Sequence, residues 1–177
     1  MSKDKKPSSK KRQFETLFRR GTELLKRGDM SKAAQLLQRA HQLDPQHVDV
    51  AINLSGAYIL AKKFKKAVAV LEPLSRTDSD HVMLWTNLGA AYLGNPIIAN
   101  NEEQLQAIDA FKRALDLNPI APNVAYNIGL IYRDRREYDK AIQWFERAIK
   151  ANPNDKDARI LIERIQQKQA ENPSENA

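Results

Sequence analysis

Residues 122–155 read PNVAYNIGLIYRDRREYDKAIQWFERAIKANPND, and this 34-residue stretch decides the fold. Apolar and small residues recur at helical spacing on either side of a polar break near Arg136. Spacings of three and four residues place such side chains on one face of a helix, so the stretch predicts two amphipathic helices joined by a turn. The small residues Gly129 and Ala141 stand where the two helices would approach each other most closely. Pro153 then ends the unit, because proline disfavours helix in the residue before it.

The same pattern occurs four times, and we place the units at 14–47, 48–81, 82–121 and 122–155. In each unit a small residue of the second helix precedes the terminating residue by 12 positions: Ala33 and Pro45, Ala67 and Ser79, Ala107 and Pro119, Ala141 and Pro153. The third unit carries six additional residues between its helices. A unit of this size cannot bury its apolar face alone, so the repetition predicts an all-α stack in which neighbouring units share one core.

The chain is similar to the tetratricopeptide repeat family, whose 34-residue units follow the pattern Gly–x2–Tyr…Ala–x3–Phe…Pro. The fourth unit matches this pattern at Gly129, Tyr132, Ala141, Phe145 and Pro153. The resemblance implies a right-handed α-solenoid of four helix–turn–helix units, with the first helix of each unit on a concave surface. It also implies a scaffold or adaptor that binds another protein or a peptide.

The two ends differ in character from the repeats. Residues 1–13 are predicted to form a disordered basic tail, because 1–12 hold a net charge of +5 out of +7 for the whole chain and no apolar residue after Met1. Residues 156–170 predict a helix that caps the stack, with Ile160, Leu161, Ile162 and Ile165 on its inner side. We expect 171–177 to be a disordered polar end.

No group of residues predicts catalysis, a metal site or a cofactor, and we expect no enzyme. The chain has no cysteine, and its three histidines, His41, His47 and His81, do not form the closely spaced pair that a zinc site on one helix requires. No apolar run is long enough to cross a bilayer, and no apolar stretch follows the basic N-terminus as in a secretory signal. The expected location is therefore the cytoplasm.

The candidate binding site is the concave face that the resemblance implies. Its sixth repeat position holds Arg19, Asn53, Asn87 and Asn127. An asparagine amide both donates and accepts, so Asn53, Asn87 and Asn127 could bind the backbone of an extended peptide. The fifth position adds apolar walls at Phe18, Ile52 and Tyr126. In the alternative interpretation these asparagines only tie neighbouring helices together.

The carboxylate clamp that some members of this family use for chaperone C-termini is not expected. The clamp has Lys and Asn at positions 5 and 9 of one unit, Asn at position 6 of the next, and Lys and Arg in the third. Only Asn53 matches when the pattern starts in the first unit, and only Asn87 matches when it starts in the second.

Two further functions are alternatives to peptide binding. The basic tail could hold nucleic acid or an anionic membrane, but we do not expect this, because no aromatic residue lies among its charges and the body is nearly neutral. The repeats could also self-associate into a homo-oligomer through Phe14 and Phe18 of the first helix, since open stacks have two free ends.

Two local features of the sequence carry predictions of their own. Pro73 lies inside a predicted helix and should kink it or end it near Glu72, because proline removes a backbone hydrogen bond. The insertion within 94–104 should lead into a capping box at Asn101 and Gln104. Its Ile97 and Ile98 should tuck against Leu93 and Leu105, and the alternative is that they contact a partner as a second binding site.

Overall fold

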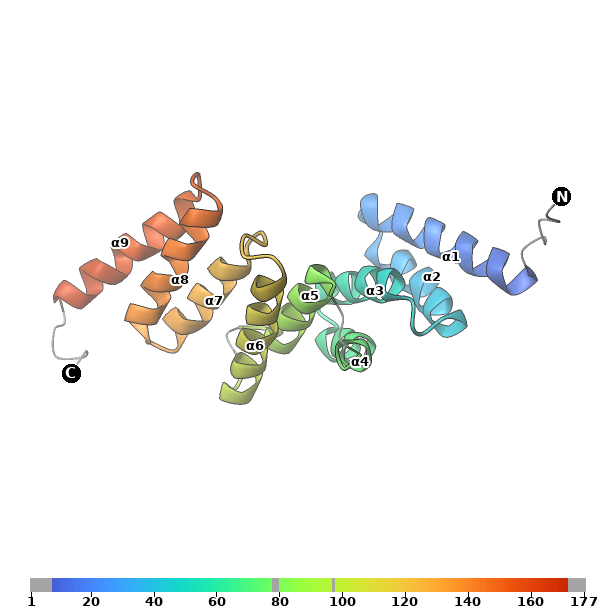
Figure 1. Cartoon of the computed structure of the whole chain (residues 1–177), viewed down its shortest axis with the longest axis horizontal. Helices are drawn as coiled ribbons and strands as arrows, with labels where there is room; N and C mark the ends of the chain where they lie inside the picture. The colour runs from blue at the N-terminus through green and yellow to red at the C-terminus, as the bar shows by residue number, and fades with distance from the viewer. Residues whose placement is uncertain (1–7, 78–79, 97, 172–177) are drawn as a thin grey trace.

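A computed structural model describes residues 8–77, 80–96 and 98–171, and the regular elements of these residues are all helices. In chain order they are α1 (Ser9–Lys26), α2 (Met30–Leu43), α3 (Val48–Leu60), α4 (Phe64–Ser75), α5 (Val82–Leu93), α6 (Asn101–Leu117), α7 (Val124–Asp134), α8 (Tyr138–Ala151) and α9 (Lys156–Glu171). They follow one another along the long axis, with α1 and α9 at opposite ends of the stack (Figure 1). The predicted all-α solenoid is confirmed.

The helices pack in sequential pairs that share a core. The pairs α1 and α2, α3 and α4, α5 and α6, and α7 and α8 form the four units, and the first helix of each later unit also packs on the second helix of the unit before it. Large side chains with almost no exposed surface recur along the stack, among them Leu37, Leu54, Leu71, Leu88, Phe111, Ile128 and Phe145. Burial is thus distributed over successive contacts between neighbours, as expected of a repeat stack.

Three glycines let the two helices of a unit approach each other. A Cβ at Gly21 would lie 2.7 Å from Leu37 Cγ, one at Gly89 would lie 2.6 Å from Phe111 Cδ1, and one at Gly129 would lie 2.7 Å from Phe145 Cδ1. Such distances are shorter than any ordinary carbon–carbon contact. The glycines are therefore required by packing, and a large buried side chain of the second helix fills the space that each one leaves.

The turn between the two helices has the same geometry in the first, second and fourth units. It places Gly28, Lys62 and Arg136 at positive φ, of 81°, 56° and 61°. After each of these residues, a backbone N–H donates to the carbonyl five positions earlier, as from Lys63 to Tyr58 at 2.7 Å. This is the Schellman arrangement, in which the left-handed residue is usually glycine. Two of the three turns therefore carry a strained residue that has a side chain.

Replacement of Lys62 by glycine is expected to stabilise the chain by about 0.5–1 kcal/mol. The left-handed conformation costs a residue with a side chain about 1–2 kcal/mol, and the greater backbone freedom of glycine when unfolded offsets part of that gain. Lys65→Gly removes the same charge from the nearby helix α4 and should destabilise by about 1 kcal/mol. Urea midpoints of the two variants should lie on opposite sides of the parent. Equal midpoints would contradict the strain at Lys62.

The first helix begins earlier than the sequence predicts. Helix α1 starts at Ser9, and the Ser8 hydroxyl caps it by accepting a hydrogen bond from the Lys11 N–H at 3.2 Å. Residues 9–13 are thus helical, although their composition placed them in the tail, and 1–7 lie outside the described residues. Composition did not predict this because a helix that is already nucleated by packed residues such as Leu17 extends outward at little cost.

Helix α4 continues past the point where the sequence predicts its end. It runs to Ser75 with Pro73 in its last turn, so the predicted end near Glu72 was wrong, and the alternative of a kink stays a prediction. The hydroxyl of Ser75 donates to the Glu72 carbonyl, and that of Thr77 donates to the Leu74 carbonyl, each at 2.8 Å. Pro73 removes one backbone bond near the helix terminus, where side chains and solvent can satisfy the remaining carbonyls.

The insertion leads into α6 one residue earlier than predicted. The capping box is formed by Asn100 and Glu103: the Asn100 side chain accepts from the Glu103 N–H, and the Glu103 carboxylate accepts from the Asn100 N–H, each at 3.0 Å. The N–H groups of Ile98 and Ala99 both donate to the Asn95 carbonyl, at 3.1 and 3.0 Å. Ala99 is half-buried in this turn, whereas Ile98 is 76% exposed. The predicted tuck of Ile98 was therefore wrong.

Leu93 and Leu105, the residues against which Ile97 and Ile98 were predicted to pack, differ in exposure. Leu93 is half-buried, whereas Leu105 is itself 44% exposed on α6 and so provides no buried pocket for the loop. Ile97, for which the same tuck was predicted, lies outside the described residues.

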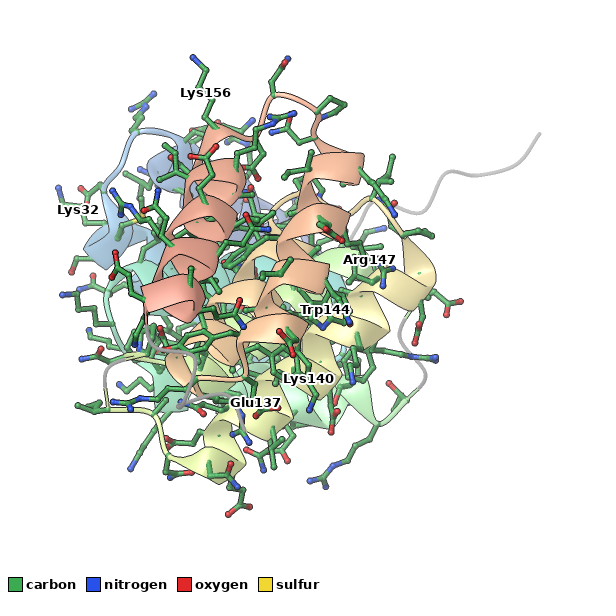
Figure 2. The ribbon with its side chains drawn as sticks, turned by 90° about the vertical axis from the view of Figure 1, so that its left-hand side faces the viewer. Lys32, Glu137, Lys140, Trp144, Arg147 and Lys156 are labelled. Carbon is green, nitrogen blue, oxygen red and sulfur yellow. The ribbon has the colours of Figure 1, made fainter. Side chains whose placement is uncertain are left out.

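Helix α9 lies beside α8 at the C-terminal end, with Lys156 at its start (Figure 2). The Asp155 carboxylate accepts a hydrogen bond from the Ala158 N–H at 2.9 Å and so caps the helix. Ala158 and Ile165 are buried. Ile160 was predicted on the inner side but is 43% exposed, because it falls outside the three- and four-residue spacing that links 158 to 165.

Candidate functional site

The first helices of the second, third and fourth units present a half-buried face. Its residues occupy the fifth, sixth and ninth positions of each unit, and none of them is either fully buried or fully exposed. We call the nine residues the first-helix face: Ile52, Asn53, Gly56, Thr86, Asn87, Ala90, Tyr126, Asn127 and Leu130. Side chains of this kind are partly held by the scaffold and partly open to solvent, as in the floor of a shallow groove.

Two of the three asparagines link consecutive first helices. The Asn53 side-chain nitrogen donates to the Thr22 hydroxyl at 3.0 Å. The Asn87 side-chain nitrogen donates to the Ile52 carbonyl at 3.2 Å and to the Ser55 hydroxyl at 3.1 Å. The tying role is therefore present at both positions. Within the described residues, however, neither Oδ1 atom accepts a hydrogen bond, so each amide keeps an acceptor for another molecule.

Asn127 differs from the other two asparagines. Its side chain makes no hydrogen bond within the described residues, and the preceding unit offers it no hydroxyl at the eighth or ninth position. The first two units supply hydroxyls at Thr22 and Ser55, whereas the third unit has Gly89 and Ala90 at the eighth and ninth positions. Neither residue can accept from the amide through a side chain. Asn127 thus keeps both its donor and its acceptor.

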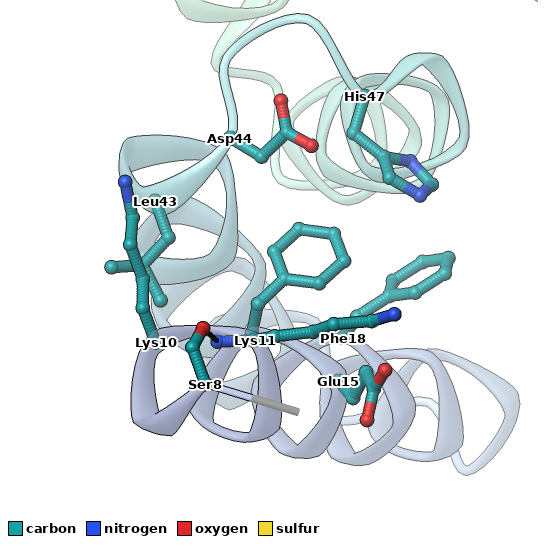
Figure 3. A pocket seen from close by; sticks show the side chains of 9 residues that line it. Ser8, Lys10, Lys11, Glu15, Phe18, Leu43, Asp44 and His47 are labelled. Atoms are coloured by element: carbon teal, nitrogen blue, oxygen red, sulfur yellow. Dashed lines mark hydrogen bonds between the residues drawn. The ribbon is translucent and has the colours of Figure 1, made fainter. Parts of the chain in front are cut away.

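Phe18 lines a hollow of about 570 Å³ at the N-terminal end of the stack. Its ring centroid lies 5.4 Å from that of His47, and Phe14 lies 5.0 Å from the same imidazole. Figure 3 shows Phe18 and His47 beside this hollow, which Lys11 of α1 also lines. The buried Nδ1 of His47 has no hydrogen-bond partner there. The hollow at this end thus combines aromatic walls with two lysines and two carboxylates, from Lys10, Lys11, Glu15 and Asp44.

Sequence reasoning missed His47 and Lys11. Lys11 had been assigned to the tail, but it precedes Phe14 by three residues and Phe18 by seven, which places all three on one face once the helix is known to begin at Ser9. That spacing was a usable signal. His47 follows the end of the first unit, and only packing against α1 reveals that it belongs to the same hollow.

Tyr126 lines a second hollow, of about 280 Å³, in the fourth unit. Its ring lies 5.6 Å from that of Phe145, and burial, with smaller contributions from Asp157 and Asp155, raises the pKa of its hydroxyl. The hydroxyl is therefore protonated at neutral pH and can donate. Phe18 and Tyr126 belong to the first and last units, so the two apolar walls stand far apart along the solenoid (Figure 1).

Small residues occupy the ninth repeat position in the middle of the first-helix face. A Cβ at Gly56 would meet only the Asn87 side-chain nitrogen, at 3.9 Å, which is an ordinary contact distance. The neighbouring small residue Ala90 is also half-buried, and Ile52 is half-buried beside Asn53. A side chain at position 56 would thus have room at its Cβ beside the Asn87 amide.

Comparison with known proteins matches the repeats to one family. Two models described as tetratricopeptide repeat match residues 24–91 and 101–156. Anaphase-promoting complex subunit 3 of Schizosaccharomyces pombe is 30% identical over 138 residues, which are 75% of this chain and 20% of that protein. The peroxisomal targeting signal receptor of Candida albicans is 27% identical over 56% of this chain and 16% of its own length. The chain therefore spans less than a third of these relatives.

A solved structure supports the same architecture. A crystal structure of MamA is 27% identical to this chain and superposes with a TM-score of 0.74 over 85% of this chain and 84% of MamA. The likeness thus extends through most of both chains and is not confined to one pair of helices. Within the described part of this chain, no helix has the length and apolarity needed to span a membrane.

Proposed function

Because this chain belongs to the tetratricopeptide repeat family, we propose that it is a scaffold that binds a peptide segment of another protein along the first-helix face. One observation carries the proposal: Asn53, Asn87 and Asn127 recur on successive first helices, each with a side-chain oxygen that accepts no hydrogen bond within the described residues. An extended peptide presents backbone N–H groups along its length, and these are the donors that such oxygens require.

The ties through the amide nitrogens support this role. Asn53 is held by Thr22, and Asn87 is held by Ser55 and the Ile52 carbonyl. An amide held by its nitrogen has a fixed orientation, so its oxygen loses little conformational freedom when a ligand binds. The two interpretations of the asparagines are therefore compatible, because one group of the amide serves the scaffold and the other is available to the peptide.

The two apolar walls suggest how such a peptide would be anchored. Phe18 and Tyr126 each line a hollow, and an aromatic wall beside an open hollow accepts a bulky side chain. The relatives include a complex subunit and a targeting-signal receptor, both of which are named for association with other molecules. These names support a binding role and leave the partner of this chain undefined.

Replacement of Gly56 by arginine is expected to abolish peptide binding without unfolding the chain. The new side chain would project between Asn53 and Asn87 from a position whose Cβ has room, and arginine favours helix over glycine by about 1 kcal/mol. Peptides of 12 residues are selected from a displayed random library on the parent chain, and their affinities are measured by fluorescence anisotropy. We expect at least a tenfold loss in Gly56→Arg.

The control variant is Gln143→Arg, which adds the same side chain to an exposed position of α8. It should bind the selected peptides as the parent does, and both variants should show the parent's circular dichroism. Equal affinity in Gly56→Arg and Gln143→Arg would mean that the selected peptides bind away from the first-helix face, and the proposal would fail.

A further inference from the structure

The insertion of the third unit forms one wall of a second groove. The groove has a volume of about 960 Å³ and is larger than either hollow at the ends of the first-helix face. The turn and first residues of α4 form the opposite wall, and the end of α5 forms the floor. We call it the turn groove, and the residues that define it here are Lys62, Lys63, Phe64, Lys65, Leu93 and Ile98. None of them belongs to the first-helix face.

The extra residues create this groove because they replace a tight turn. At the end of α5, Gly94 has a φ of 55° and a ψ of −117°, a conformation open only to glycine, and the chain then leaves the helix pair. The Phe64 ring packs against this point, with its Cδ2 atom 3.4 Å from where a Gly94 Cβ would lie. Ile98 stands beyond it on the wall formed by the insertion and is 76% exposed.

The wall formed by the insertion, which we call the outer wall, is held by hydrogen bonds. The capping box between Asn100 and Glu103 fixes the start of α6, and the Gln104 side-chain nitrogen donates to the Ala99 carbonyl at 3.3 Å. From the fourth unit, Arg135 donates to the side-chain oxygen of Asn101 and to that of Gln104, the latter at 3.2 Å. Ile98 is thus an exposed apolar side chain that directly precedes a segment held by several hydrogen bonds, which lowers the entropy lost when it is covered.

Arg135 is itself anchored by Glu137. The guanidinium Nε donates to the Glu137 carboxylate at 2.6 Å, and Lys140 donates to the other oxygen of that carboxylate at 2.6 Å. These hydrogen bonds, first from Lys140 and then from Arg135, lower the pKa of Glu137 and keep it ionised. Figure 2 shows Glu137 and Lys140 close together at the start of α8.

The opposite wall, formed by the turn before α4 and the first residues of that helix, is strongly basic, and we call it the inner wall. Lys62, Lys63, Lys65 and Lys66 are exposed within five consecutive positions, and among the described residues none of them forms an ion pair. Lys66 lies 5.9 Å from the ring centroid of Tyr58. The one carboxylate in the lining, Glu103, is engaged in the capping box. A groove with an apolar floor and a wall of unpaired positive charge is complementary to a ligand that is apolar and acidic.

We propose that the turn groove is a second docking surface, which takes an acidic segment of a partner protein. A bulky apolar side chain of the segment lies between Phe64 and Ile98, and flanking carboxylates lie over Lys63 and Lys65. A flat bilayer surface does not enter a groove, and a nucleic acid would leave the apolar floor without a matching group. The proposal concerns the edge that carries the turns, and it stands independently of peptide binding on the first-helix face.

The test uses the full chain and a displayed library of random 12-residue peptides. The library is first depleted on Lys63→Glu/Lys65→Glu and is then selected on the parent chain. We expect peptides that combine a large apolar residue with several Asp or Glu residues. Their affinity for the parent should exceed that for Lys63→Glu/Lys65→Glu at least tenfold, and Ile98→Ser should also weaken binding at least tenfold.

Matched variants separate this site from general effects of charge, apolarity and folding. Lys112→Glu/Lys150→Glu makes the same charge change at exposed positions of α6 and α8, and Met83→Ser removes another exposed apolar side chain. Both should bind the selected peptides as the parent does. Gly56→Arg should also bind them normally, so that this proposal and the proposed function can fail separately.

Three results would overturn the proposal. One is that the selection yields only neutral peptides, or yields no peptide that binds the parent more tightly than Lys63→Glu/Lys65→Glu. Another is loss of binding in Gly56→Arg with no loss in Ile98→Ser. The third is that the parent chain binds no acidic peptide but binds phosphatidylserine vesicles or a DNA oligonucleotide, and that this binding depends on Lys63 and Lys65.

Discussion

Replacement of Gly89 by leucine is expected to destabilise the chain by about 3 kcal/mol or more. A Cβ at this position would already lie 2.6 Å from the Phe111 ring, and leucine adds three further carbons to a contact with no free space. Overpacking of this kind typically costs about 1–3 kcal/mol, and the cost rises when the neighbour is a buried ring that cannot move away. Urea unfolding followed by far-UV circular dichroism measures the effect.

The matched control is Gly56→Leu, which makes the same change in the equivalent helix of the preceding unit. A Cβ at Gly56 meets only one atom, at 3.9 Å, so this variant should be as stable as the parent or more so, because leucine favours helix. Phe111→Leu combined with Gly89→Ala should lose less stability than the two separate losses added together, since the smaller side chain relieves the clash. Equal midpoints for Gly89→Leu and Gly56→Leu would contradict the packing described here.

Replacement of Ile165 by aspartate is expected to cost about 3 kcal/mol or more and to promote aggregation. Ile165 is 4% exposed in the contact between α9 and the last unit, and a carboxylate there would be buried without a partner. Loosening α9 would uncover apolar side chains of α8, among them Ile142 and Ile149, which pack against the same core. Thermal unfolding and light scattering measure the two consequences.

The same helix provides the control for this substitution. Ile160→Asp introduces the same group at a position that is 43% exposed, where surface changes usually alter stability by no more than about 0.5 kcal/mol. Deletion of 156–177 should reproduce the effect of Ile165→Asp. A shortened chain as stable as the parent would show that α9 does not serve as a cap.

The helical stack was predictable because it follows from repetition. Gly129 and Phe145 recur at the spacing of Gly89 and Phe111, apart from the six inserted residues, so one recognised unit predicted the packing of the others. The start of α1 was not predictable from composition, since a polar sequence becomes helical when its neighbours are already packed. The end of α4 depended on whether Pro73 fell in the middle of the helix or in its last turn.

The candidate site was predictable in position but not in detail. Repeat numbering located Asn53, Asn87 and Asn127 on equivalent turns, but their hydrogen bonds depend on which residue the preceding unit brings opposite each amide. That pairing is set by how the units stack, and it differs for Asn127. The turn groove was less predictable still, because the path of an insertion is not repeated elsewhere in the chain. The sequence allowed Ile98 either to pack against the helices or to face solvent, and the structure leaves it exposed.

The junction between the third and fourth units is fastened differently from the earlier ones. Asn53 and Asn87 join their units across the middle of the first helices, whereas Asn127 makes no such bond within the described residues and Arg135 instead clasps the start of α6 at the outer edge. The third and fourth units also share one continuous buried core, which includes Phe111 of α6, Ile128 of α7 and Phe145 of α8. Arg135 thus adds a polar tie at the edge of an apolar junction, and a ligand bridging Asn87 and Asn127 would supply the tie across the middle of the first helices that this junction lacks among the described residues.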